Sequence, residues 1–268
     1  MLPNLEAEFE KRKPWVTKFV INGMAYGGNL NLIEDMRLRQ FFECFPQAQT
    51  ILELGSLEGG HTFGLAQRST VKRVLGIEGR QANVNKAVFV QDLLGTKNVE
   101  FALANLESAD LSSFGKFDVV FCSGLLYHLP EPWKLISQIS GVSPNLFIWT
   151  HYAHENQATE TAHGYRGWRY QEHGLADPLS GMSADSFWPT LDSLYAILKD
   201  HGFKTFCLFE NNTTHMHGPS ITLAATAQPA GLSQQLYWRV IQWRWLASGW
   251  YGKVIRWLGA KTRKIQGS

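Results

Sequence analysis

With 268 residues, 44% of them hydrophobic, the chain can bury a sizeable core and is expected to form one α/β domain with appendages. No run of eighteen uninterrupted apolar residues occurs and residues 1–13 are charged, so neither a membrane-spanning helix nor a signal peptide is expected. The net charge of +2 is small, and Cys44, Cys122 and Cys207 lack paired spacing, which favours a reducing, cytoplasmic location.

The first 48 residues are predicted to form an N-terminal helical extension. A short polar helix is expected over residues 5–13, and helical periodicity returns over residues 35–45. Residues 15–30 lie between them and mix apolar residues with the pair Asn22-Gly23. The main domain is expected to span residues 49–227.

This main domain is organised around a strand that leads into a glycine-rich turn and then a helix. Residues 49–54 form an apolar run, Gly55 and the pair Gly59-Gly60 follow, and a helical pattern resumes at residue 61. Glycine lets the backbone turn sharply and approach a ligand closely. The spacing of these glycines differs from that of a dinucleotide fingerprint, and no lysine follows them as in a P-loop.

The stretch Glu53-x-Gly55-x-x-x-Gly59 resembles the first motif of class I S-adenosylmethionine-dependent methyltransferases. The resemblance implies that the loop holds the methionyl part of S-adenosylmethionine, and that the Glu53 carboxylate attracts its ammonium group directly or through water. The expected cofactor contacts in this loop are Glu53, Gly55, Ser56, Leu57 and Gly59. A glycine loop of the same plan that binds no ligand is the alternative.

The next two strands end in polar residues. Glu78 ends a buried strand, where a carboxylate can accept hydrogen bonds from both hydroxyls of a ribose, although helix capping is an alternative role. The third strand ends at Asn105, where this family often places an aspartate that meets the adenine amino group. An amide oxygen can accept the same hydrogen bond. Gly79 and Leu106 are expected to contact the cofactor beside them.

The fourth strand, residues 116–124, leads into Gly124-Leu125-Leu126-Tyr127-His128-Leu129. This loop looks like that of many class I methyltransferases, including the tRNA wobble-uridine carboxymethyltransferases, which carry a similar Leu-Tyr-His. The resemblance places Ser123 and His128 beside the cofactor. His128 is expected to cover the cofactor or to act as a base, and a histidine that only holds the loop is the alternative.

Histidines at strand ends are the candidate catalytic residues. Methyl transfer to a hydroxyl requires an aligned acceptor and removal of a proton, and the pKa of histidine lies near working pH. We favour His151, which follows the fifth strand, with His128, His154 and Tyr152 as further candidates. The pattern His151-x-x-His154-Glu155 also suggests a metal site, but no third ligand is fixed by spacing, and no metal is predicted.

The remainder of the domain contains an insertion and a closing hairpin. The insertion, residues 152–183, is long and rich in polar and aromatic residues, and is predicted to recognise the substrate. A capped helix is expected over residues 183–199, followed by strands at residues 203–210 and 219–226. The predicted fold class is therefore α/β, with a doubly wound, Rossmann-like, seven-stranded sheet that ends in an antiparallel hairpin.

Residues 228–268 are predicted to form a basic, tryptophan-rich C-terminal tail. No acidic residue follows Glu210, whereas seven basic residues do: Arg239, Arg244, Lys253, Arg256, Lys261, Arg263 and Lys264. Packing of the tryptophans on the main domain or on a second subunit, as in a homodimer, is the preferred interpretation. Peripheral membrane contact through residues 233–264 comes next, and nucleic-acid binding is less favoured.

Together these features predict an S-adenosylmethionine-dependent methyltransferase that methylates, at oxygen, a small molecule or a lipid- or sugar-linked metabolite. A tRNA-modifying methyltransferase or carboxymethyltransferase is the first alternative. Leu129-Pro130 disfavours it, because the wobble-uridine enzymes have an arginine pattern at this place. A non-catalytic cofactor-binding scaffold, targeted by its tail, is the second alternative.

Overall fold

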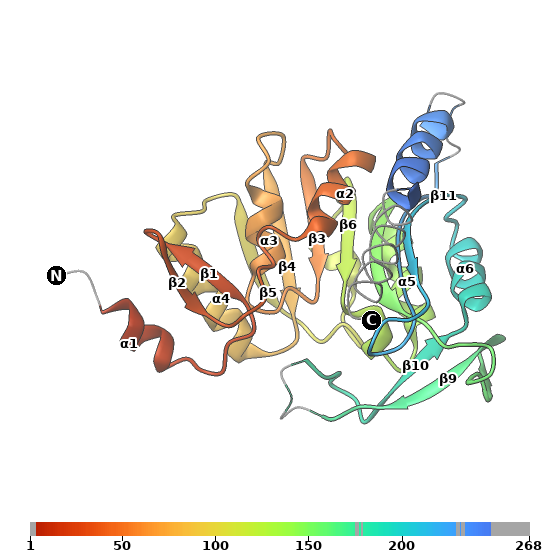
Figure 1. Cartoon of the computed structure of the whole chain (residues 1–268), viewed down its shortest axis with the longest axis horizontal. Coiled ribbons are helices and arrows are strands. Elements are labelled where there is room, and N and C mark those ends of the chain that lie inside the picture. The colour runs from red at the N-terminus through yellow and green to blue at the C-terminus, as the bar shows by residue number, and fades with distance from the viewer. Residues whose placement is uncertain (1–3, 175–176, 178, 229–230, 232–233, 248–268) are drawn as a thin grey trace, which may run out of the picture.

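A seven-stranded sheet lies at the centre of the computed structural model, which describes residues 4–174, 177, 179–228, 231 and 234–247 (Figure 1). Its strands are β3 (Thr50–Leu54), β4 (Arg73–Glu78), β5 (Val99–Leu103), β6 (Val119–Ser123), β7 (Asn145–His151), β11 (Thr205–Asn212) and β12 (Ser220–Thr226). They are ordered β11-β12-β7-β6-β3-β4-β5, and β12 runs antiparallel to both of its neighbours. The predicted doubly wound sheet with a terminal antiparallel hairpin is confirmed.

Helices cover both faces of this sheet. α2 (Met36–Cys44), α3 (Gly60–Ala66) and α4 (Gln81–Leu94) contribute to the apolar cluster on one face, and α5 (Pro132–Val142) and α6 (Leu191–Asp200) to that on the other. Successive side chains of a strand point to opposite faces, so Ile51 of β3 joins the first cluster and Leu52 the second. Burial on both faces explains why the strands read as continuous apolar runs.

The N-terminal extension is helical only in part. α1 (Leu5–Glu10) and α2 are helices, but β1 (Lys18–Ile21) and β2 (Met24–Gly27) form an antiparallel hairpin between them. The prediction of a helical extension is therefore wrong for this segment. The physical reason is the pair Asn22-Gly23, whose φ angles of 51° and 79° make a two-residue turn that matches the twist of paired strands.

Glu58 anchors the start of the hairpin to the main domain. Its buried carboxylate accepts hydrogen bonds from the backbone N–H groups of Val16 (3.1 Å) and Thr17 (2.7 Å), and lies 3.0 Å from Nζ of Lys86. A buried charge is tolerated only with such partners. These contacts fix Val16 at the wall of the cavity described below.

The insertion forms a small antiparallel sheet in the order β10-β9-β8, from β8 (Glu160–Ala162), β9 (Tyr165–Gln171) and β10 (Asp185–Pro189). β10 occupies the start of the segment predicted as a helix over residues 183–199, and α6 begins only at Leu191. The prediction fails there because Phe187 is fully buried in the cluster with α5. Its backbone N–H donates to the carbonyl oxygen of Leu129, and the strand that contains it pairs with β9.

Residues 234–247, called the C-terminal helix below, pack beside α2 and β11. Trp238 is buried, with its ring centroid 5.9 Å from that of Phe45. The described part of the tail therefore packs on the main domain, and residues 248–268 lie outside the described residues. Among the helices that the structure describes, none is both long and apolar enough to cross a membrane. The boundaries at 48/49 and 227/228 stay predictions.

Candidate functional site

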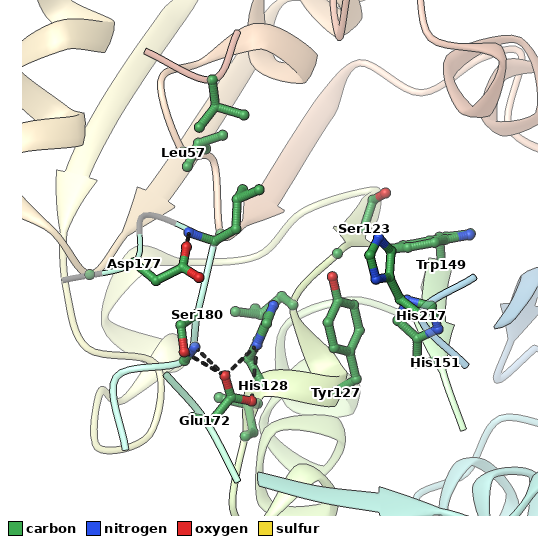
Figure 2. A pocket seen from close by; sticks show the side chains of 18 of the residues that line it. Leu57, Ser123, Tyr127, His128, Trp149, His151, Glu172, Asp177, Ser180 and His217 are labelled. Carbon is green, nitrogen blue, oxygen red and sulfur yellow. Dashed lines mark hydrogen bonds and ion pairs between the residues drawn. The ribbon is translucent and has the colours of Figure 1, made fainter. Parts of the chain in front are cut away.

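A cavity of about 880 Å³ opens at the carboxyl ends of the parallel strands, where β3 adjoins β6 (Figure 2). Open α/β sheets bind ligands at this place, because the strand order reverses there and leaves a crevice. The predicted cofactor residues that line it are Gly55, Ser56, Leu57, Glu78, Gly79, Asn105, Leu106, Ser123 and His128. Residues from four strand ends thus meet in one site.

The glycine loop after β3 contains residues with positive φ and lies close to the loop that follows β6. Gly55 has a φ of 75°, and a Cβ there would lie 3.3 Å from Cβ of Leu125. Glycine permits both the conformation and the close approach. Leu57 also has a positive φ, of 50°, and its N–H donates to Oε2 of Glu78 at 2.9 Å. The loop is thereby tied to the end of β4.

Glu78 lines the cavity although most of its surface is buried. Its second oxygen, Oε1, accepts from the N–H of Arg80 at 2.9 Å and from Nδ2 of Asn83 at 3.3 Å. Burial raises the pKa of Glu78, and these hydrogen bonds with that from Leu57 oppose the rise. A carboxylate has about four acceptor positions, so Glu78 can still accept bonds from a diol such as ribose.

Glu53 does not line the cavity. Alternation along β3 directs its side chain, like that of Ile51, to the face covered by α2 and α3. There Oγ1 of Thr62 donates to Oε2 of Glu53, and Nδ1 of His61 lies 3.7 Å from Oε1. Burial raises the pKa of Glu53 to about 8. The structure therefore places a neutral carboxyl beneath the loop, not the expected contact with the cofactor ammonium group.

Gly59 also lies outside the cavity lining. It is the N-cap residue of α3 with a φ of 83°, and a Cβ there would come within 2.8 Å of the rings of Phe63 and Phe101. Close packing and backbone conformation, not a ligand, therefore require glycine at this position.

Glu53→Gln is expected to stabilise the protein at alkaline pH. The folded state keeps the Glu53 proton up to a pKa of about 8, whereas an unperturbed glutamate releases it near 4.5. Stability therefore falls as the pH rises between these values and stays lowered above 8. Glutamine mimics the neutral form. At pH 9 the free energy of unfolding of the variant should therefore exceed that of the wild type by an amount on the order of a few kcal/mol, and this difference should nearly vanish at pH 5. If the variant and the wild type differ in stability by the same amount at both pH values, the pKa of Glu53 is not raised in the folded state.

Four buried polar atoms along the cavity have no hydrogen-bond partner among the described residues. They are Oγ of Ser56, Nε of Arg80, Oε1 of Glu107 and Nε1 of Trp188. Buried polar groups are nearly always hydrogen-bonded in folded proteins, so these atoms are the ones that a bound polar ligand would satisfy. Three of them belong to the side formed by the loops after β3, β4 and β5, which therefore fits a nucleoside.

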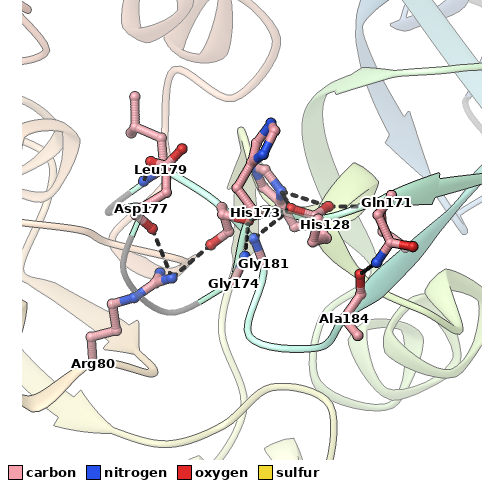
Figure 3. A network of polar contacts seen from close by, with 12 residues as sticks. Arg80, His128, Gln171, His173, Gly174, Asp177, Leu179, Gly181 and Ala184 are labelled. Carbon is pink, nitrogen blue, oxygen red and sulfur yellow. Dashed lines mark hydrogen bonds and ion pairs between the residues drawn. The ribbon is translucent and has the colours of Figure 1, made fainter.

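The insertion closes over this nucleoside side. Nη2 of Arg80 donates to the carbonyl oxygens of Asp177 (3.2 Å) and Ser180 (2.8 Å), and Figure 3 shows Arg80 reaching the insertion in this way. Oγ of Ser183 donates to Oε2 of Glu107 at 2.6 Å. The segment predicted to recognise the substrate thus also covers the expected cofactor site.

Aromatic rings line the opposite part of the cavity, between β6, β7 and the β11–β12 loop. This part, called the acceptor side below, consists of Tyr127, Trp149, His151, Tyr170, Trp188, His215 and His217. Trp188 stacks on His151 with 5.1 Å between ring centroids and 9° between planes, and Tyr127 meets His151 edge-on at 4.7 Å. The acceptor side therefore offers flat apolar surfaces with polar edges.

His215 and His217 of the acceptor side were not predicted from the sequence. Their loop follows β11, which runs parallel to β7, so its start lies at the edge where the cavity opens. The pattern His215-Met216-His217 between the two predicted strands was the available signal. Although these histidines lie near His151, no group of three potential ligands within the described ranges has the geometry to hold a metal ion.

His128 and Glu172 form a hydrogen-bonded pair at the boundary of the two sides (Figure 2). Nδ1 of His128 lies 3.1 Å from each carboxylate oxygen of Glu172. The same carboxylate accepts three further hydrogen bonds, from Oγ of Ser180 (2.8 Å), the N–H of Gly181 (2.7 Å) and Oγ of Ser186 (2.7 Å). Burial raises the pKa of Glu172, but the hydrogen bonds outweigh it and hold the pKa at about 2. Because a carboxylate only accepts, Nδ1 carries a hydrogen, and in the neutral imidazole Nε2 therefore has the lone pair.

His151 is oriented by the backbone. Its Nδ1 lies 3.0 Å from the carbonyl oxygen of Gly218 and 3.2 Å from that of Pro219. Carbonyl oxygens only accept, so Nδ1 donates and Nε2 is again free to accept. Burial, assisted by His215 and His217, lowers the pKa of His151 to about 4. His151 is therefore a good hydrogen-bond acceptor but a weak base.

Neither Tyr152 nor His154 lines the cavity. The Tyr152 hydroxyl donates to Oδ1 of Asn211 at 2.7 Å, and His154 is exposed. Beyond β7, Ala153 pairs with Thr190, which leads the chain away from the site. The prediction of Tyr152 and His154 as catalytic candidates is therefore corrected, because the chain leaves the cavity directly after β7.

Arg37 brings a guanidinium group to the wall of the cavity and was also not predicted from the sequence. Its Nη1 donates to Oγ of Ser123 at 2.8 Å, and its guanidinium lies 4.9 Å from the centroid of the Trp149 ring. Asp35, the N-cap residue of α2, pairs with Arg37 and lies 3.1 Å from Nε2 of His61. This fixed guanidinium is suited to hold a carboxylate such as that of a methionyl group.

Comparisons with known proteins agree with this geometry. A family model described as a methyltransferase domain matches residues 47–163. The N-terminal domain of EvdMO1, crystallised in the presence of SAH and D-fucose, is 34% identical with a TM-score of 0.77, covering 84% of this chain and 96% of that one. In the structure of EvdMO1 itself, the match covers 47% of that chain, at 32% identity and a TM-score of 0.67. The chain thus spans about half the length of that protein.

Two other similarities are more limited. An O-methyltransferase family protein from Burkholderia thailandensis shares the fold at 15% identity with a TM-score of 0.50, covering 74% of this chain and 55% of that one. An uncharacterized protein of Rickettsia prowazekii is 32% identical over 81 residues, which are 30% of this chain and 14% of that protein.

Proposed function

The chain belongs to the class I S-adenosylmethionine-dependent methyltransferases, and from this premise we propose that it methylates a hydroxyl oxygen of a sugar or sugar-linked small molecule. S-adenosylmethionine is its cofactor, and it supplies a methyl group activated by a positively charged sulfur. We propose that the cofactor is held by Gly55, Ser56, Glu78 and Asn105, which all line the cavity. What we propose is the class of the acceptor molecule and the atom that is methylated.

The acceptor side supports a sugar-like acceptor. A sugar ring presents apolar C–H faces and polar edges, which match the rings of Trp188 and Tyr127 and the polar atoms between them. Nε1 of Trp188 is a buried donor without a partner among the described residues, and Nε2 of His151 is a free acceptor. The EvdMO1 domain, crystallised in the presence of D-fucose, provides parallel support from a similar protein.

His128 is proposed as the base, which favours oxygen as the methylated atom. A hydroxyl must lose its proton as its oxygen bonds to carbon, and Nε2 of His128 can take that proton. The ionised Glu172 then stabilises the resulting imidazolium, as the aspartate of a Ser-His-Asp triad does. His151, favoured from the sequence, has a lowered pKa and is better suited to orient the hydroxyl.

Transfer of a labelled methyl group tests this function. The purified protein is incubated with methyl-tritiated S-adenosylmethionine and separate pools of free sugars, nucleotide-linked sugars, phenols and tRNA. We expect label in a sugar pool, on an oxygen that NMR identifies, and incorporation that is slower by a factor of about 10² to 10⁴ with the His128→Asn variant. Label in tRNA alone, or on nitrogen or carbon, would contradict the proposal, and cofactor binding without transfer to any pool would favour the scaffold alternative.

A further inference from the structure

The C-terminal helix is held in a fixed orientation, so one of its faces always points outward. Trp238 and Ile241 are buried against the main domain. Glu43 of α2 accepts a hydrogen bond from Nε1 of Trp245 at 2.6 Å, and its carbonyl oxygen accepts one from the Tyr237 hydroxyl at 3.1 Å. These contacts decide which side chains face solvent.

The outward face carries an apolar stripe. Leu236, Val240 and Trp243 follow a spacing of four and three residues, which places them on one side of a helix, and they are 55%, 64% and 74% exposed. Large apolar side chains gathered in this way mark a binding surface more often than single exposed ones do. Arg239 and Arg244 flank the stripe on its two sides, Arg244 being ion-paired with Glu43 of α2, and no acidic residue occurs in the helix.

The charged residues of the C-terminal segment that contains this stripe are all of one sign. Every charged residue after Glu210 is a lysine or arginine, and five of the seven lie beyond the helix, interspersed with Trp250, Tyr251 and Trp257. Cations beside tryptophan and aliphatic side chains are the composition that binds anionic lipid, because the rings enter the interface while the cations meet phosphates. A partner that complements the composition of this segment is therefore both apolar and negatively charged.

We propose that the stripe Leu236, Val240 and Trp243 docks on the surface of an anionic membrane. A second copy of the chain fits less well, since two such faces in contact would bring the Arg239 side chains together without an acidic residue from either helix. A nucleic acid fits less well too, because Leu236 and Val240 can neither pair with a phosphate nor stack on a base. The docking is independent of the proposed acceptor.

Vesicle flotation of the full chain tests the proposal. We expect the protein to float with vesicles of phosphatidylcholine and phosphatidylglycerol but not of phosphatidylcholine alone. The double variant Val240→Asp/Trp243→Ser should reduce the bound fraction about tenfold or more. Val88→Asp, on the exposed surface of α4, is the matched control and should float as the wild type does.

Three readouts make the result decisive. The variant should keep the wild-type melting temperature, cofactor affinity and methyl transfer to a free acceptor, because its substitutions lie outside the cavity and the core. The proposal is overturned if the wild type does not float with anionic vesicles, or if the double variant floats equally well. A dimer in sedimentation that the double variant loses, without vesicle binding, would identify a second copy as the partner instead.

Discussion

Replacing His128 with asparagine is expected to lower the turnover of methyl transfer by a factor of about 10² to 10⁴, the usual contribution of a general base. Asparagine can still donate to Glu172, but it has no group that takes up a proton where Nε2 lies. Initial rates of S-adenosylhomocysteine formation measure the loss. Cofactor affinity in calorimetry should stay near that of the wild type.

The partner variants distinguish a base from a structural residue. Glu172→Gln should also slow turnover, and the double variant with His128→Asn should be no slower than His128→Asn alone, because the pair acts as a unit. His151→Asn should mainly raise the KM for the acceptor. If His151→Asn abolishes turnover and His128→Asn leaves it nearly normal, the base is His151, as the sequence favoured.

Glu78→Gln is expected to weaken the binding of S-adenosylmethionine about 10- to 100-fold. Hydrogen bonds to a charged acceptor contribute about 1.5–3 kcal/mol, and the amide loses the charge and one of the two acceptor oxygens that we propose for the ribose. Glutamine keeps the shape of the side chain, but its single oxygen can accept from the N–H of Leu57 or from that of Arg80, not from both. Calorimetric titration with the cofactor measures the change.

A matched control for Glu78 lies on the neighbouring strand. Glu100 of β5 is exposed and paired with Arg73, outside the cavity, so Glu100→Gln should leave cofactor affinity unchanged. Melting temperatures of both variants separate lost binding from lost folding. If Glu78→Gln binds the cofactor as tightly as the wild type does, the ribose assignment is wrong.

Local patterns predicted most of the fold and the nucleoside side of the site. Buried strands read as apolar runs, and polar residues at their carboxyl ends mark one edge of a parallel sheet, so Gly55, Glu78 and Asn105 could be placed together from the sequence. The Asn22-Gly23 turn was readable in the same way and was overlooked. The strand at residues 185–189 was not readable, because burial of Phe187 depends on partners elsewhere in the chain.

The sequence by itself determined the class of the protein, its cofactor and the edge of the sheet where the cavity opens. Only the tertiary structure paired His128 with Glu172, 44 residues apart, and directed Glu53 away from the cavity. The physical reason is that a motif fixes the path of its own backbone, whereas the pKa and partners of a side chain depend on what the whole fold packs around it.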